Sequence, residues 1–144
     1  MTPENERKVE YLKGYQEKRH ELKRTRAFIN SIRDRELDIA IHYGNGLTGS
    51  SGIQRDLSSY IAQMDTEISK YLVERRDCIL CCIEIRDQIE KLPTKEQKDI
   101  LIYRYIRGYT WERIAEKMHY SIRWIHRQHG KALFNFQLPN KKCS

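Results

Sequence analysis

Hydrogen-bonding side chains recur between residues 121 and 131 with the spacing of one exposed helical face. An arginine can donate two hydrogen bonds to the O6 and N7 atoms of a guanine, and serine and histidine can bond to bases or to phosphates. The stretch therefore predicts a helix, over about residues 121–134, that contacts the base edges of double-stranded DNA. The residues expected to read bases are Ser121, Ile122, Arg123, His126 and Arg127.

Three short helices are predicted to position this face. Thr94, Thr110 and Ser121 each precede a helical apolar pattern and have side chains that can cap a helix N-terminus. Thr94 and Gln97 also have the spacing of a capping box. Gly108 is expected to end the first helix, because glycine adopts the left-handed conformation without a Cβ penalty.

A tight turn at His119 and Tyr120 is predicted to join the second and third helices. Ala115 is expected where these helices cross closely, since a small side chain is needed there. The arrangement is a helix-turn-helix, whose second helix can lie in the major groove. The apolar positions of the three helices are Ile100, Leu101, Tyr103, Tyr105 and Ile106; Trp111, Ile114, Ala115 and Met118; and Ile122, Ile125, Leu133 and Phe134.

The charge of the chain is concentrated in the same region. From Pro93 onward there are eleven Lys and Arg against four Asp and Glu, an excess equal to the whole net charge of +7. A basic excess on a helix-turn-helix is typical of a surface that contacts DNA phosphates. The residues predicted to contact phosphates are Arg104, Thr110, Arg113, Lys117 and Lys131.

Several segments of this region resemble region 4 of bacterial sigma-70 factors, which reads the −35 promoter element. They are Leu92-Pro93, Tyr103-Arg104-Tyr105, Gly108-Tyr109-Thr110-Trp111, Ile114-Ala115-Glu116-Lys117-Met118, Tyr120-Ser121 and Lys131-Ala132-Leu133. The whole chain is similar to the ArpU- and RinA-like regulators of Gram-positive prophages and mobile elements. The resemblance implies control of phage or mobile-element transcription, most simply activation, in the cytoplasm of a bacterial host.

The sequence departs from the sigma pattern at identifiable places. Ile122 stands where region 4 usually has a polar residue, Gln128 where it has an apolar one, and His119 where glycine is common. No segment resembles sigma region 2, which melts promoters. The resemblance therefore implies which positions of this chain form the base-reading surface. It does not imply that the chain prefers the −35 sequence.

Two long helices are predicted to precede this domain, at about residues 4–40 and 54–91. A Gly/Ser-rich loop at 43–53 separates them. The expected fold is all-α: residues 1–91 form a coiled-coil-like helical hairpin, 92–136 the helix-turn-helix domain, and 137–144 a flexible tail. Apolar residues recur every seventh position along the second helix, at Leu57, Met64, Tyr71, Cys78, Ile85 and Leu92. This heptad series could pack in an antiparallel hairpin or in a parallel homodimer.

The sequence offers little for catalysis or for cofactors. Cys78 and Cys81 have CxxC spacing, but no second CxxC or His pair completes a zinc site, so buried structural cysteines are the favoured interpretation. No Asp or Glu falls among His119, His126 and His129, and no nucleophile–base set occurs. No signal peptide or membrane-spanning run is expected. We therefore expect neither an enzyme nor a bound cofactor.

Two functions remain open from the sequence. One is a sequence-specific transcription regulator that acts as a homodimer. The other is an adaptor that binds host RNA polymerase through the apolar surface of Tyr103, Ile106 and Tyr109 without reading DNA. Binding through several phosphates should fall steeply with salt, whereas an apolar contact should not, so salt dependence separates the two.

Overall fold

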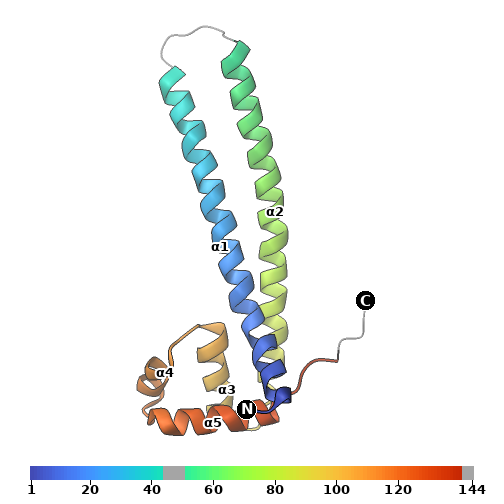
Figure 1. The fold of residues 1–144 in the computed structure, drawn as a ribbon, viewed down its shortest axis with the longest axis vertical. Coiled ribbons are helices and arrows are strands. Elements are labelled where there is room, and N and C mark those ends of the chain that lie inside the picture. Colours follow the sequence, from blue (N-terminus) through green and yellow to red (C-terminus); the bar gives the residue numbers. More distant parts are fainter. Residues whose placement is uncertain (44–50, 141–144) are drawn as a thin grey trace. The chain divides into compact units, whose positions relative to one another are not determined.

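The computed structural model describes residues 1–43 and 51–140, with side chains described for 1–35 and 57–140. Helices account for most of these residues, and no strand occurs among them, so the predicted all-α class is confirmed. The elements (Figure 1) are α1 (Pro3–Tyr43), α2 (Ser51–Ile89), α3 (Lys95–Leu101), the π-helical turn η1 (Ile102–Ile106), α4 (Trp111–Met118) and α5 (Ile122–Asn135). Residues 44–50 of the predicted loop lie outside the described residues.

The two long helices pack antiparallel along the chain. Tyr11 donates a hydrogen bond to Glu84 at 2.9 Å, and Thr25 donates one to Glu74 at 2.7 Å. The later residue of α1 is bonded to the earlier residue of α2, as in an antiparallel pair of helices. The predicted helical hairpin is confirmed. Helix α1 continues to Tyr43, three residues past the predicted end.

Contacts divide the chain into two compact units. The first joins residues 1–18 to 78–144, and the second comprises residues 19–77. Both boundaries fall inside long helices. In the second unit, Ile29, Ile32 and Met64 are buried together, with Tyr60, Ile68 and Tyr71 packed around them.

The first unit has two apolar cores that hold the C-terminal helices. The larger combines residues from α1, α2, α3, η1 and α5: Leu12, Ile85, Ile89, Leu92, Leu101, Tyr105, Ala132, Leu133 and Phe136. The smaller lies between α3, α4 and α5 and contains Ile100, Ile114, Ala115 and Ile125. The burial of Ala115 agrees with its predicted place at a close helix crossing.

The end of α5 differs from the prediction. Phe134 was expected on the apolar face but is 79% exposed, whereas Phe136, which was not among the predicted apolar positions, is fully buried. The buried positions run from Ile125 through His129 and Ala132 to Phe136, which is the three-to-four-residue spacing of one helical face. Phe134 lies off that face, and the Phe136 amide still donates to the Ala132 carbonyl at 2.8 Å.

The heptad series of α2 is used within the chain. Met64, Cys78, Ile85 and Leu92 are buried, whereas the neighbouring Arg75 is exposed. The same residues cannot face a second copy of α2 while they pack against α1. The series therefore supports the hairpin rather than a parallel dimer through this face.

Candidate nucleic-acid interface

The three predicted N-caps all form. The Thr94 hydroxyl accepts from the Gln97 amide at 3.3 Å, Thr110 from Arg113 at 3.2 Å, and Ser121 from Trp124 at 3.1 Å. Each bond satisfies an amide that has no partner inside its own helix. The capping box is altered, because the Gln97 side-chain oxygen accepts from the Asn135 side chain at 3.1 Å.

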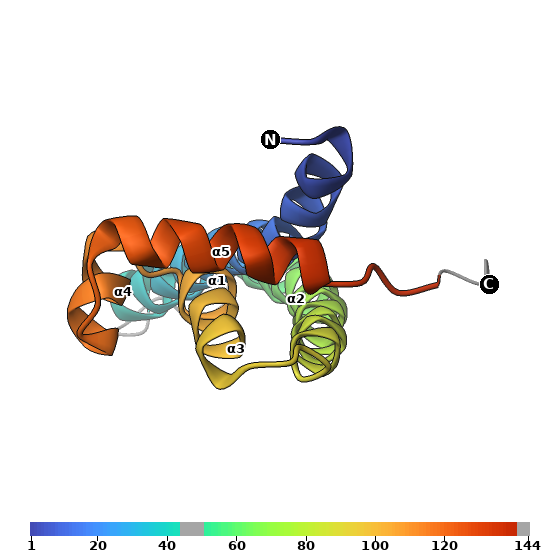
Figure 2. The same ribbon diagram turned by 90° about the horizontal axis from the view of Figure 1, so that it is seen from below.

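A tight turn joins α4 to α5, as predicted. His119 adopts the left-handed conformation with φ of 60°, and the Tyr120 amide donates to the Ala115 carbonyl at 3.1 Å. Histidine tolerates this conformation better than most side chains. Gly108 also has a positive φ, 73°, and a Cβ there would lie 3.4 Å from the Gln16 side chain. The left-handed backbone predicted at Gly108 therefore forms. Figure 2 shows α5 lying across α3 and α4.

The predicted reading residues lie on the exposed face of α5 and at its N-cap. The opposite face is buried through Ile125, His129, Ala132 and Leu133, so the helix is fixed in rotation about its axis. The exposed residues of this face and its N-cap include Ser121, Ile122, Arg123, His126, Arg127 and Lys131. The fold brings together every residue predicted to read bases.

The predicted phosphate-contacting residues divide into two groups. Thr110, Arg113, Lys117 and Lys131 are exposed. Arg104 is instead half-buried: its guanidinium lies 4.4 Å from the centre of the Trp111 ring, and its Nη1 donates to the Tyr109 carbonyl at 3.1 Å. Arg104 therefore holds the segment that leads into α4.

A buried polar pair stands behind the exposed face. The Tyr105 hydroxyl and His129 Nε2 lie 2.8 Å apart, and burial raises the pKa of Tyr105 to about 12. Burial, together with the nearby charges of Arg104 and His126, lowers the pKa of His129 to about 4. His129 is therefore a neutral core residue. Its burial was missed in the sequence, although it lies four residues after Ile125.

Two residues of α1 complete the unit and were not foreseen. Lys8 is 5% exposed, and its ammonium donates to the Leu133 and Phe134 carbonyls at 2.9 and 3.3 Å. Gln16 Nε2 donates to the Tyr105 and Ile106 carbonyls at 3.0 and 2.9 Å. These carbonyls belong to the last turns of two helices, where intrahelical partners are lacking. Only the tertiary fold identifies these contacts.

The surface considered for polymerase binding is largely occupied by internal contacts. The rings of Tyr103 and Tyr109 are stacked with centres 5.6 Å apart, and both side chains are half-buried, as is Ile106. Arginine guanidinium groups lie over both rings. The Cζ atom of Arg107 is 5.5 Å from the centre of the Tyr103 ring, and that of Arg113 is 4.8 Å from the centre of the Tyr109 ring. The cluster presents cationic groups in addition to apolar ones.

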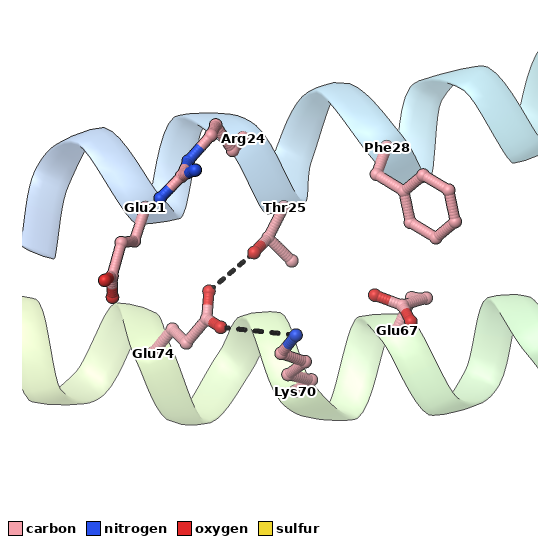
Figure 3. A pocket seen from close by; sticks show the side chains of 7 residues that line it. All are labelled: Glu21, Arg24, Thr25, Phe28, Glu67, Lys70 and Glu74. Atoms are coloured by element: carbon pink, nitrogen blue, oxygen red, sulfur yellow. Dashed lines mark hydrogen bonds and ion pairs between the residues drawn. The ribbon is translucent and has the colours of Figure 1, made fainter.

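The second unit contains a cleft lined mostly by charged and polar side chains. It has a volume of about 480 Å³ and lies between α1 and α2 (Figure 3), lined by Glu21, Arg24, Thr25, Phe28, Glu67, Lys70 and Glu74. Glu74 accepts a hydrogen bond from Thr25 at 2.7 Å and pairs with Lys70 at 4.0 Å. Among the described residues, no three His, Cys, Asp or Glu are grouped to hold a metal ion.

The cysteines of α2 have the environment of core residues. Cys78 is buried, Cys81 and Cys82 are half-buried, and burial raises the pKa of the Cys81 thiol. Redox-active and metal-binding cysteines instead have lowered pKa values, because the thiolate is the reactive form. Cys143 lies outside the described residues.

Together, α4, the His119 turn and α5 form a helix-turn-helix, with α3 packed beside it. Residues 89–135 match the family model for Sigma-70, region 4, and the chain therefore carries a domain of that kind. Sigma-70 region 4 is a helix-turn-helix DNA-binding fold. Comparisons of the chain with curated proteins and with solved structures gave no match. Within the residues that the structure describes, no helix is long and apolar enough to cross a bilayer.

Proposed function

We propose that the protein is a sequence-specific DNA-binding transcription regulator that inserts α5 into the major groove. The observation that carries this proposal is the exposed face of α5 in a sigma-70 region 4-like domain. Arg123 and Arg127 read base edges, and Ser121 and His126 contact bases or phosphates. Thr110, Arg113, Lys117 and Lys131 hold the sugar–phosphate backbone, with Arg104 supporting them from within the domain.

The cellular role follows from the resemblance described above. The protein activates phage or mobile-element genes in the cytoplasm of a bacterial host, in contact with host RNA polymerase. It binds as a homodimer, because dimeric helix-turn-helix proteins recognise two half-sites about one helical turn apart. An inverted repeat in the selected DNA, with that spacing, is the expected sign of the dimer.

The test is selection of bound duplexes from a random DNA library with the purified protein at moderate salt. An enriched motif is expected. Arg127→Ala should weaken binding to that motif by about 5- to 150-fold, the loss of one bidentate base contact, and should change binding to unrelated DNA far less. Arg76→Ala removes the same charge from an exposed position on α2 and is the matched control.

Equal losses on the motif and on unrelated DNA in Arg127→Ala would exclude base reading by that residue. The alternative function is the polymerase-binding adaptor, which would use the half-buried rings of Tyr103 and Tyr109. That function predicts no enriched motif and a polymerase complex that persists as salt is raised. DNA binding through several phosphates should instead fall steeply with salt.

A further inference from the structure

One apolar side chain stands on the reading face of α5. Ile122 is the first residue of the helix, directly after the N-cap Ser121, and is 42% exposed. The other exposed positions through the third turn carry polar or charged side chains or none: Arg123, His126, Arg127, Gly130 and Lys131. An apolar group at the leading end of an otherwise basic face calls for an explanation.

Folding does not account for Ile122. The apolar core of α5 is built on the opposite face, from Ile125 to Phe136. Ser121 already caps the helix, and a β-branched residue has a lower helix propensity than a straight-chain one. The aromatic neighbours Tyr120 and Trp124 stack on each other, with ring centres 3.7 Å apart. A polar residue at this position would preserve every one of these contacts.

The chemistry of the major groove gives Ile122 one suitable partner. Base edges present hydrogen-bond donors and acceptors there, and the C5-methyl group of thymine is their one apolar group. An isoleucine placed against donors or acceptors would leave them without water or a partner, which is unfavourable. We propose that Ile122 packs on the C5-methyl of a thymine and so selects that base in the target site. This inference rests on the proposed function.

The test removes the methyl group alone. In the motif selected from the random library, each thymine is replaced singly by deoxyuridine, which keeps base pairing and lacks only the C5-methyl. At one position the wild-type protein should lose about fourfold in affinity, the effect of exposing one buried methyl group. Ile122→Ala should bind the thymine site more weakly and should bind the thymine and deoxyuridine forms of that position equally well.

Three variants serve as controls. Ile79→Ala makes the same chemical change at a 48% exposed position on α2. This variant should distinguish thymine from deoxyuridine as well as the wild-type protein does. Arg127→Ala should bind more weakly but still distinguish thymine from deoxyuridine at the Ile122 position. Ile122→Val should keep a reduced discrimination, because it retains part of the apolar surface. Circular dichroism of each variant establishes that the helices are intact.

The outcomes separate this inference from the proposed function. Absence of any enriched motif overturns both. A motif whose thymines all tolerate deoxyuridine in the wild-type protein overturns the role of Ile122 and leaves the proposed function standing. Undiminished discrimination in Ile122→Ala does the same, because the methyl group would then be recognised by another residue.

Discussion

His129 is a titratable residue held in the core of a DNA-binding domain. Its ring lies beside Trp111, with centres 4.7 Å apart, and its Nε2 is bonded to the Tyr105 hydroxyl. Arg104 and His126 are the charged or titratable groups whose charges lower its pKa in addition to burial. A positive charge on His129 would be buried beside the Trp111 ring and close to the charges of Arg104 and His126. The His129 side chain is therefore neutral in the folded domain near neutral pH.

The resulting prediction concerns stability against pH. The pKa of His129 is about 4 in the folded protein and about 6.5 in the unfolded chain. Below pH 6.5 only the unfolded chain takes up the proton, so the free energy of unfolding should decrease as pH falls from 6.5 towards 4 and stay level above 7. The decrease approaches about 1.4 kcal/mol per pH unit.

Urea denaturation at a series of pH values, on the wild-type protein and on His129→Gln, measures this contribution. Glutamine does not titrate and can still bond to Tyr105, so the difference between the two proteins isolates His129 from the carboxylates that titrate in both. Parallel pH profiles of the two proteins would show that His129 is protonated as readily in the folded state as in the unfolded one.

At the scale of elements, the start of α1 acts as a partner of the helix-turn-helix. Lys8, Leu12 and Gln16 recur every four residues and so lie along one helical face. Leu12 is fully buried in the core, while Lys8 and Gln16 donate to the terminal carbonyls of α5 and η1. One face of one helix thus holds the ends of two others.

Replacing Lys8 tests this contact. Lys8→Met keeps an unbranched apolar stem but removes the donor to the Leu133 and Phe134 carbonyls. The free energy of unfolding should fall by about 1–3 kcal/mol, the cost of leaving buried acceptors unpaired. Lys13→Met, at an exposed position on the same helix, should change it by less than about 0.5 kcal/mol. Equal effects in the two variants would show that the Lys8 contact contributes nothing to stability.

Local features of the helices were predictable, whereas contacts between distant segments were not. The caps at Thr94, Thr110 and Ser121 depend on side chains within three residues of the amides they satisfy, and all three form. The exposed face of α5 follows from periodicity in the same way. The burial of Phe136 was missed because it depends on apolar residues that α1 and α2 contribute to the core.

At the scale of the molecule, the DNA-binding unit is larger than the segment that matches sigma region 4. The match covers residues 89–135, but the compact unit also includes residues 1–18 and 78–88. Leu12 and Ile85 are fully buried in its main core. Removing them would expose the apolar side of α5, so the matched segment lacks part of the core that it needs.

Two shortened chains test this organisation. Residues 89–144 alone should show no cooperative urea transition, because the core lacks its α1 and early α2 members. A chain that joins residues 1–18 to 78–144 through a short Gly/Ser linker should unfold cooperatively and retain the near-ultraviolet circular dichroism of the buried tyrosines. Cooperative unfolding of both chains, with equal stability, would show that the helix-turn-helix domain is self-sufficient.

The discontinuous DNA-binding unit also has a consequence for biosynthesis. Residues 19–77 are contiguous, so their helices can pair as soon as they leave the ribosome. The core of the other unit contains both Leu12 and Phe136 and cannot close until the ribosome has passed Phe136. At a synthesis rate of roughly 10 residues per second, Leu12 lacks its final partner for about ten seconds. A nascent chain can therefore pair the helices of residues 19–77 before the core of the other unit closes.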